Sequence, residues 1–188
     1  LSLGGSEMCI RDRDDTKHNL LFISKYPEII HEFTDAMKDR DIEIDTAING
    51  IEAAAKIKKK NYDIVITGLS LEGFNGEQII TYLNKTAPST VCIIYTTTIS
   101  SAQLHFFINE RNVFRVFLRP VDFRGAFWEA LEEAYEYHAV QVKNEEDTGA
   151  RRQEQEKQER EIEIMDQRMR SQRQARDCLL YTSPSPRD

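Results

Sequence analysis

Short apolar runs alternate with amphipathic stretches between residue 19 and residue 142. Unbroken apolar runs are typical of strands that are buried on both faces of a parallel sheet, and strict alternation is typical of an edge strand. Five runs qualify as predicted strands: Leu20–Ile23, Ile42–Asp45, Tyr62–Thr67, Val91–Tyr95 and Val113–Leu118. The second run alternates apolar and polar residues, and Arg115 interrupts the fifth.

A stretch with helical spacing follows each predicted strand. Pro27 opens the first, because proline is tolerated in a first turn. Asn75 with Gln78 predicts a capping box, and Asp122 is the expected cap of the last helix. The expected apolar faces are Ile30, Phe33 and Met37; Ile51, Ala54 and Ala55; Ile79, Ile80 and Leu83; and Phe127, Leu131, Ala134, Tyr135 and His138, with a further helix over 102–110. This alternation predicts an α/β fold, with a parallel sheet covered on both faces.

Beyond Val142 the composition changes to mostly Glu, Gln, Arg and Lys. A thin apolar stripe of Ile162, Met165 and Met169 runs through residues 143–177, and Gly149 is a candidate break in it. The spacing fits a short coiled-coil seam, and it fits a solvated single helix or a disordered linker nearly as well. We interpret the stretch as a linker that leads to a further domain.

Composition and charge exclude several classes of protein. Hydrophobic residues make up 40% and charged residues 30% of the 188 residues, and the net charge is -7. An acidic chain does not favour a nucleic-acid groove, and no run approaches the roughly 20 apolar residues of a membrane span. Three cysteines without a CxxC pair favour neither a disulfide scaffold nor structural zinc. Cys92 lies in a predicted strand and reads as an inert core thiol.

The two ends of the chain resemble translated laboratory DNA. Residues 1–13 are similar to the translation of a sequencing adapter, and residues 178–188 are similar to the translation of its opposite strand. We therefore assign the fold to residues 14–142 and leave both ends out of it. On this interpretation the reading frame is a fragment, and a domain is missing at one of its ends.

Ligands of open parallel sheets bind beyond the carboxyl ends of the strands. That rule selects Ser24 and Lys25 after the first strand, Gly68 after the third, Thr96 after the fourth and Arg119-Pro120 after the fifth. The segments around these positions are Tyr62–Ile66, Gly73–Gly76, Ile94–Thr96 and Phe117–Pro120. In this order and spacing they resemble the receiver domain of two-component response regulators over residues 17–138.

The resemblance implies a doubly wound, flavodoxin-like sheet of order 2-1-3-4-5, followed here by the polar helical extension. In this order the second and fifth strands are the edges, where Glu43, Asp45 and Arg115 are expected to face water. The family carries phosphate on an aspartate after the third strand. Two acidic residues after the first strand hold Mg²⁺, and a hydroxyl and a Lys-Pro pair read the phosphoryl group.

This chain departs from that pattern at most of its positions. Ser24 and Lys25 replace the acidic pair, Gly68 replaces the phosphoacceptor and Arg119 replaces the lysine, while Thr96 and Pro120 remain. Val116 stands at the switch position, where the family has an aromatic residue. We therefore expect a degenerate receiver without Mg²⁺ or other cofactor. It would be a cytoplasmic, non-enzymatic module of a phosphorelay-type pathway that contacts a histidine kinase, an output domain or a second copy of itself.

By the same resemblance, three residues are candidates for a surface that contacts a protein partner: Phe106, Phe107 and Arg115. Adjacent aromatics on a short helix predict one exposed ring or a distorted helix with two buried rings, and the pattern does not choose between them. The Arg119-Pro120 bond is a candidate cis peptide by resemblance. The four histidines show no metal-ligand spacing.

Other functions stay open on the sequence. Thr67 or Ser70 could be an unusual phosphoacceptor, although neither has an adjacent base. A flavodoxin-like anion or nucleotide binder is the second alternative, but the loop from Ser24 to Pro27 lacks the glycines that cradle phosphate. Lys25 and Arg119 could line an anion pocket with Thr96, or they could splay into water.

Overall fold

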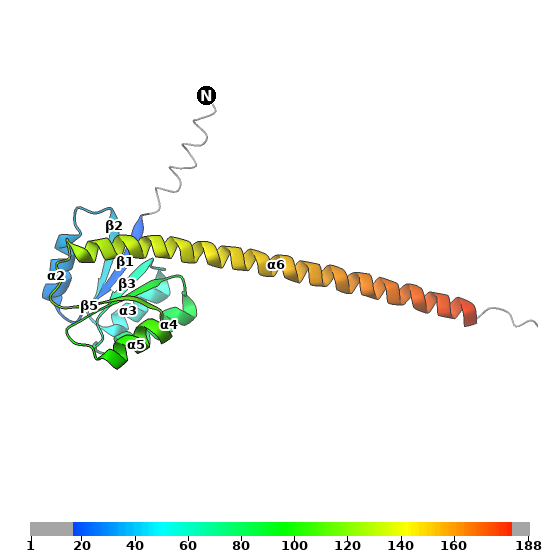
Figure 1. Ribbon diagram of the computed structural model, residues 1–188, viewed down its shortest axis with the longest axis horizontal. Coiled ribbons are helices and arrows are strands. Elements are labelled where there is room, and N and C mark those ends of the chain that lie inside the picture. Colours follow the sequence, from blue (N-terminus) through cyan, green and yellow to red (C-terminus); the bar gives the residue numbers. More distant parts are fainter. Residues whose placement is uncertain (1–16, 182–188) are drawn as a thin grey trace, which may run out of the picture. The chain divides into compact units, whose positions relative to one another are not determined.

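The computed structural model describes residues 17–181, with side chains up to residue 178. Strands and helices alternate along this part of the chain (Figure 1). The strands are β1 (His18–Ile23), β2 (Ile42–Ala47), β3 (Ile64–Thr67), β4 (Val91–Thr96) and β5 (Val113–Leu118). The helices are α2 (Pro27–Ala36), α3 (Gly50–Lys59), α4 (Gly76–Thr86), α5 (Ser101–Glu110) and α6 (Ala126–Tyr181).

All five strands are parallel, in the order β2-β1-β3-β4-β5. This arrangement confirms the predicted α/β fold and its strand order. The register places Ile23 beside Thr67, and Thr96 beside Leu118, so that the strands end at a common edge. The loops that follow β1, β3, β4 and β5 are therefore neighbours, which is the condition for a shared site.

The sheet separates two apolar cores, because successive side chains of a strand point to opposite faces. One core packs β1, β3 and β4 against α2 and the first turns of α6, through Leu20, Phe22, Phe33, Ile64, Ile66, Ile93, Phe127 and Leu131. The other packs the same strands against α3, α4 and α5, through Leu21, Ile23, Ala53, Val65, Ile80, Leu83, Ile94 and Phe107. Figure 1 shows α2 and α6 on one side of the sheet and α3, α4 and α5 on the other.

Side-chain caps mark the starts of α3, α4 and α5, whereas the N-cap residue of α2, Tyr26, makes no side-chain hydrogen bond. Asn75 and Gln78 form the predicted capping box of α4, and Ser100 and Gln103 form another at α5. The expected cap at Asp122 is wrong, because α6 begins at Ala126. The Asp122 carboxylate accepts a hydrogen bond from the backbone N–H of Arg124 at 3.0 Å, and it closes the turn that precedes the helix.

The predicted buried face of α3 is also wrong. Ile51 is 64% exposed, and the buried residues are Gly50, Ala53 and Ile57. Gly50 lies directly against the backbone of Phe74, since a Cβ atom there would lie 1.8 Å from the carbonyl oxygen of Phe74. Only glycine lets α3 approach that loop so closely.

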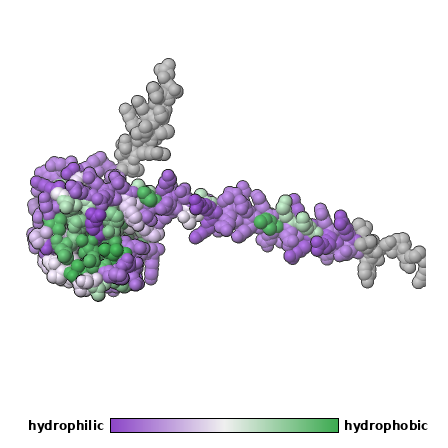
Figure 2. Space-filling view, in the orientation of Figure 1, coloured by the Kyte–Doolittle hydropathy of each residue, from purple (hydrophilic) through white to green (hydrophobic). Residues whose placement is uncertain are grey.

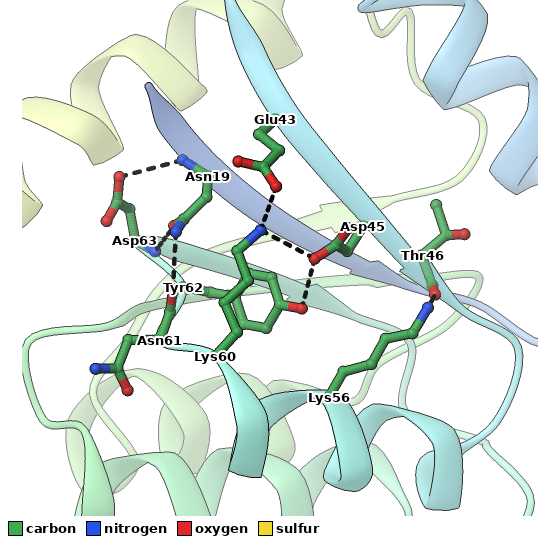
Figure 3. Close-up of polar contacts among 9 residues, drawn as sticks. All are labelled: Asn19, Glu43, Asp45, Thr46, Lys56, Lys60, Asn61, Tyr62 and Asp63. Atoms are coloured by element: carbon green, nitrogen blue, oxygen red, sulfur yellow. Dashed lines mark hydrogen bonds and ion pairs between the residues drawn. The ribbon is translucent and has the colours of Figure 1, made fainter. Parts of the chain in front are cut away.

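A polar network lines the β2 edge of the sheet (Figure 3). The Lys60 ammonium donates to Glu43 Oε1 at 2.6 Å and to Asp45 Oδ2 at 3.2 Å. The Tyr62 hydroxyl donates to the same Asp45 oxygen at 2.7 Å. Asp45 was expected to face water, but it is half-buried, and these contacts lower its pKa.

The chain divides into two compact units, and the boundary between them along the sequence falls between Val142 and Lys143. In the second unit, α6 runs without a break through Gly149, so the candidate break there is wrong. Every described side chain from residue 143 onward is exposed, including those of Ile162, Met165 and Met169. Its surface is hydrophilic except for a few apolar spots (Figure 2). Residues 1–13 lie outside the described part, and the second adapter-like segment is described only as far as Tyr181.

Candidate functional site

The loops at the common edge enclose a cavity of about 60 Å³. It is lined by Ser24, Lys25, Tyr26, Gly68, Leu69, Ser70, Leu71, Tyr95, Thr96, Thr97 and Arg119. Five of the six residues predicted for the site meet here. The sixth, Pro120, does not line the cavity, although its peptide bond with Arg119 is cis as predicted.

The two cations of the cavity share an aromatic platform. The Arg119 guanidinium carbon lies 4.6 Å from the centroid of the Tyr26 ring, and the Lys25 ammonium lies 5.3 Å from it. Arg119 also lies 5.9 Å from the Tyr95 ring. These distances fall within the roughly 6 Å range of cation–π attraction. Lys25 further donates to Ser70 Oγ at 3.3 Å. The expectation that both cations splay into water is therefore wrong for Arg119, which is half-buried, while the Lys25 side chain is exposed.

The small residues of the cavity have local partners. Ser24 is buried, and its hydroxyl accepts from the backbone N–H of Tyr26 at 3.2 Å. The Thr96 hydroxyl donates to the carbonyl of Thr98 at 3.3 Å. At Gly68 a Cβ atom would meet its nearest neighbour at 3.8 Å, an ordinary contact, so the cavity has room for a side chain there.

Backbone hydrogen bonds hold the loops together around the cavity. Ser24 N donates to the carbonyl of Ala47 at 3.1 Å, and Gly68 N donates to that of Ile23 at 3.1 Å. Arg119 N donates to the carbonyl of Thr96 at 2.9 Å. Each bond ties a loop residue to the end of a neighbouring strand, so the segments that carry Lys25 and Arg119 are anchored to the sheet.

Charge and burial act together on Tyr95, the innermost ring of the cavity. Burial raises the pKa of the Tyr95 phenol, the positive charge of Arg119 opposes that rise, and the negative charge of Glu32 adds to it. Glu32 is not among the residues that line the cavity. Among the described residues, the cavity wall therefore has no carboxylate and carries two positive charges.

The predicted contact surface is arranged around α5 and β5. Phe107 is buried and Phe106 is half-buried, with the Arg111 guanidinium 4.8 Å from the Phe106 ring. One aromatic of the pair thus belongs to the core, and its neighbour is partly accessible. Arg115 is exposed and forms an ion pair with Glu133 at 2.7 Å. Val116 is half-buried against the core below α5.

Sequence reasoning missed a second cluster, at the opposite edge of the sheet. Asp63 lies 3.2 Å from His138 Nε2 and 3.6 Å from His18 Nδ1, so two of the four histidines meet at one carboxylate. Asn19 adds a backbone hydrogen bond to Asp63 at 3.3 Å, drawn in Figure 3. Burial alone would raise the pKa of Asp63, but His138, Asn19 and His18 together lower it. No signal in the sequence pairs these residues, since 75 positions separate Asp63 from His138.

The burial of Cys92 agrees with the sequence analysis. Burial raises the pKa of the Cys92 thiol to about 12, which fits an inert core residue. Within residues 17–181, no group of three His, Cys, Asp or Glu side chains is placed to hold a metal ion. Over the same residues, no helix is both long enough and apolar enough to cross a membrane.

Comparison with known proteins places these features in context. The family described as response regulator receiver domain matches residues 21–125. A signal receiver domain from an HD domain-containing protein of Pseudomonas fluorescens is 19% identical, with a TM-score of 0.62, over 66% of this chain and 98% of that one. A receiver domain protein from Methanospirillum hungatei is 18% identical, with a TM-score of 0.61, over 66% of this chain and 99% of that one.

A third similar structure is an adenylate cyclase from Rhodopirellula baltica, 19% identical, with a TM-score of 0.65. The match covers 71% of this chain and 98% of that one. At these identities the solved structures show a shared fold. No curated protein matches the chain.

Proposed function

The chain belongs to the response regulator receiver domain family, and on this premise we propose that it is a degenerate receiver that acts through protein contacts, without phosphorylation of its own residues. Receivers are in general non-enzymatic signalling modules, and we extend that description to this chain. It would act in the cytoplasm, where kinases and output domains of two-component systems meet their receivers.

One observation carries the proposal, the lack of any carboxylate in the cavity wall. Phosphoryl transfer to a receiver needs a nucleophilic oxygen, and Gly68 at the acceptor position has no side chain. Ser24 and Lys25 occupy the positions of the two acidic residues. The residues known to line the cavity therefore offer neither an aspartate acceptor nor carboxylate ligands for a metal, which supports the proposal.

The donor set also does not fit Mg²⁺. This ion requires near-octahedral coordination by hard oxygen ligands, which in proteins are mostly carboxylates and water. The cavity offers hydroxyl groups instead, together with the ammonium of Lys25 and the guanidinium of Arg119. Placing a divalent cation beside two unneutralised positive charges is electrostatically unfavourable.

We further propose that the surface of α5 and β5 is the contact surface for a kinase, an output domain or a second copy. Its apolar side chains remain accessible, with Leu104 at 38%, Ile108 at 44% and Leu118 at 50% exposure. Phe106 and Arg115 lie on the same two elements. The extension would transmit orientation or dimerisation to a further domain, through the apolar stripe of Ile162, Met165 and Met169.

Incubation with acetyl phosphate, or with beryllium fluoride, in the presence of Mg²⁺ tests the absence of phosphorylation. We expect the intact mass and the amide NMR spectrum recorded with beryllium fluoride to remain unchanged, because the cavity has neither an acceptor nor metal ligands. A stable phosphoryl adduct on the unaltered chain would end the proposal.

A matched variant shows that the assay can detect a working site. The triple substitution Ser24→Asp, Lys25→Asp and Gly68→Asp restores carboxylates at the three positions, and the space at Gly68 accepts a side chain. We expect this variant to gain Mg²⁺-dependent changes that the unaltered chain does not show. The double variant Ser24→Asp and Lys25→Asp separates metal binding from acceptor chemistry.

The alternative functions have less support. Thr67 is fully buried, and its hydroxyl donates to the carbonyl of Gly68 at 2.9 Å, so it is poorly placed as an unusual acceptor. Ser70 is exposed, but its neighbour is the ammonium of Lys25, which is not a base when protonated. A cavity of about 60 Å³ is small beside the roughly 300–1,000 Å³ of typical cofactor sites, which weighs against a nucleotide.

A further inference from the structure

The cavity at the carboxyl edge concentrates positive charge that the described residues do not neutralise. Neither Lys25 nor Arg119 forms an ion pair within residues 17–178. No acidic side chain of residues 17–178 lines the cavity, and the negative charge of Glu32 acts on Tyr95 from outside it. A concave site of one sign of charge attracts counter-ions more strongly than a flat surface does.

Tyr26 holds both cations close to the cavity. A single ring lies 4.6 Å from the Arg119 guanidinium carbon and 5.3 Å from the Lys25 ammonium. Cation–π attraction at an exposed site is weak, so it positions a cation without neutralising it. An anion that bridges the two cations would therefore offset the repulsion between their like charges.

Hydroxyl groups complete a set of donors around the cavity. Ser70 Oγ accepts from Lys25 at 3.3 Å, which leaves its own hydrogen available for a second partner. Thr97 also lines the cavity and is exposed. A volume of about 60 Å³ has room for a few water molecules, which suits a small tetrahedral anion.

From these contacts we propose that the cavity is a reversible binding site for a compact phosphate-class oxyanion. Arg119 supplies a planar pair of donors, Lys25 supplies a point charge, and Ser70 and Thr97 supply hydroxyl donors. No bond is made or broken. The inference rests on the proposed lack of covalent phosphorylation, because a phosphoryl group attached to the chain would occupy the same space.

The anion has two possible sources, free inorganic phosphate and a phosphoryl group on a peptide side chain. NMR titration at constant ionic strength, with chloride as the balancing anion, measures both. Sodium phosphate is one arm, and a short phosphoserine peptide with its unphosphorylated form is the other. We expect progressive, saturable shifts of the Gly68, Ser70 and Thr97 amides with phosphate, and an unchanged intact mass in the same samples.

Charge-removing variants assign the binding to the two cations. Lys25→Ala with Arg119→Ala should weaken phosphate binding at least about tenfold, since charge-assisted hydrogen bonds are the stronger ones. Lys25→Ala alone is an exposed change that keeps the fold, and it should also weaken binding. The double variant Lys58→Ala and Lys59→Ala removes two exposed charges of α3 and is the matched control, with affinity unchanged.

The outcomes separate this inference from the proposed function. No amide shift with phosphate and no adduct would overturn the oxyanion site and leave the degenerate receiver in place. A covalent adduct would overturn the proposed function instead. Equal shifts in the Lys25→Ala and Arg119→Ala double variant would also overturn the site, because the anion would then bind elsewhere. Shifts by the phosphopeptide at lower concentration than phosphate support the site and point to a phosphorylated protein partner.

Discussion

Asp63 joins three parts of the chain at the amino edge of the sheet. It contacts His138 on α6, His18 on β1 and the backbone of Asn19. Replacing it by asparagine, Asp63→Asn, should lower the free energy of unfolding by about 1–2 kcal/mol at pH 6, since this half-buried side chain loses the negative charge that strengthens its contacts with His138, His18 and the Asn19 backbone. Urea unfolding measures this change.

The same carboxyl predicts a pH dependence with a defined sign. Its pKa is lowered in the folded state, so its contribution to stability is present above the unfolded value of about 3.8 and is lost as the pH falls through the folded value. The Asp63→Asn variant should therefore lose less stability than the unaltered chain on acidification below pH 4. Asp41, with a side chain 84% exposed, is the control. Asp41→Asn should lose as much stability on acidification below pH 4 as the unaltered chain does. The same loss of stability below pH 4 in the unaltered chain and in both variants would contradict the role of Asp63.

The positions of the predicted strand ends were enough to identify several residues that line the cavity. The ends of four parallel strands meet at one edge, so Ser24, Gly68, Thr96 and Arg119 followed from counting along the chain. Tyr26 was missed as the platform for both cations, because a periodic pattern does not say where a ring points. The Asp63 cluster was missed for the related reason that its members are distant in sequence and meet only through packing.

At the scale of the element, two glycines of the helices predict opposite effects. Gly50→Ala should destabilise the receiver unit by about 1–3 kcal/mol or more, because its Cβ would lie 1.8 Å from the Phe74 carbonyl oxygen. Gly149→Ala should stabilise its helix by roughly 0.5–1 kcal/mol, because nothing lies within 4 Å and alanine is the better helix former. Urea unfolding reports the first effect, and amide hydrogen exchange of residues 143–160 reports the second.

The two variants control for each other, because each replaces a helical glycine by alanine in the same protein. A stabilising Gly50→Ala would contradict the close approach of α3 to its neighbouring loop. Faster exchange in Gly149→Ala would contradict a continuous α6. The periodicity of α3 favoured Ile51, Ala54 and Ala55 as its buried face, whereas the helix buries Gly50, Ala53 and Ile57.

For the whole molecule, the extension is the part whose behaviour depends on a partner. The triple substitution of Ile162, Met165 and Met169 by glutamine should weaken self-association about tenfold or more, because burial of such side chains is worth about 1.5–3 kcal/mol each. Sedimentation velocity over a range of concentrations measures the association. The thermal unfolding of the receiver unit should not change, since these side chains are 65–67% exposed.

The double variant Gln167→Ala and Ser171→Ala is the control for this triple substitution. At 3.6 residues per turn these two residues lie on the side of the helix opposite the apolar stripe. This double variant should associate as the unaltered chain does. A chain that remains monomeric at every concentration, with or without the substitutions, would remove the dimerisation role from the extension and leave it as a solvated helix.

The sequence by itself determined the α/β class, the strand order through the family resemblance, and the lack of a side chain at Gly68. These properties follow from local periodicity, from short motifs and from side-chain identity, which do not depend on distant contacts. The tertiary structure alone decided which face α3 buries, how Tyr26 gathers Lys25 and Arg119, and that Asp63 meets two histidines. Those features depend on the direction of side chains that come from separate elements, and only packing brings them together.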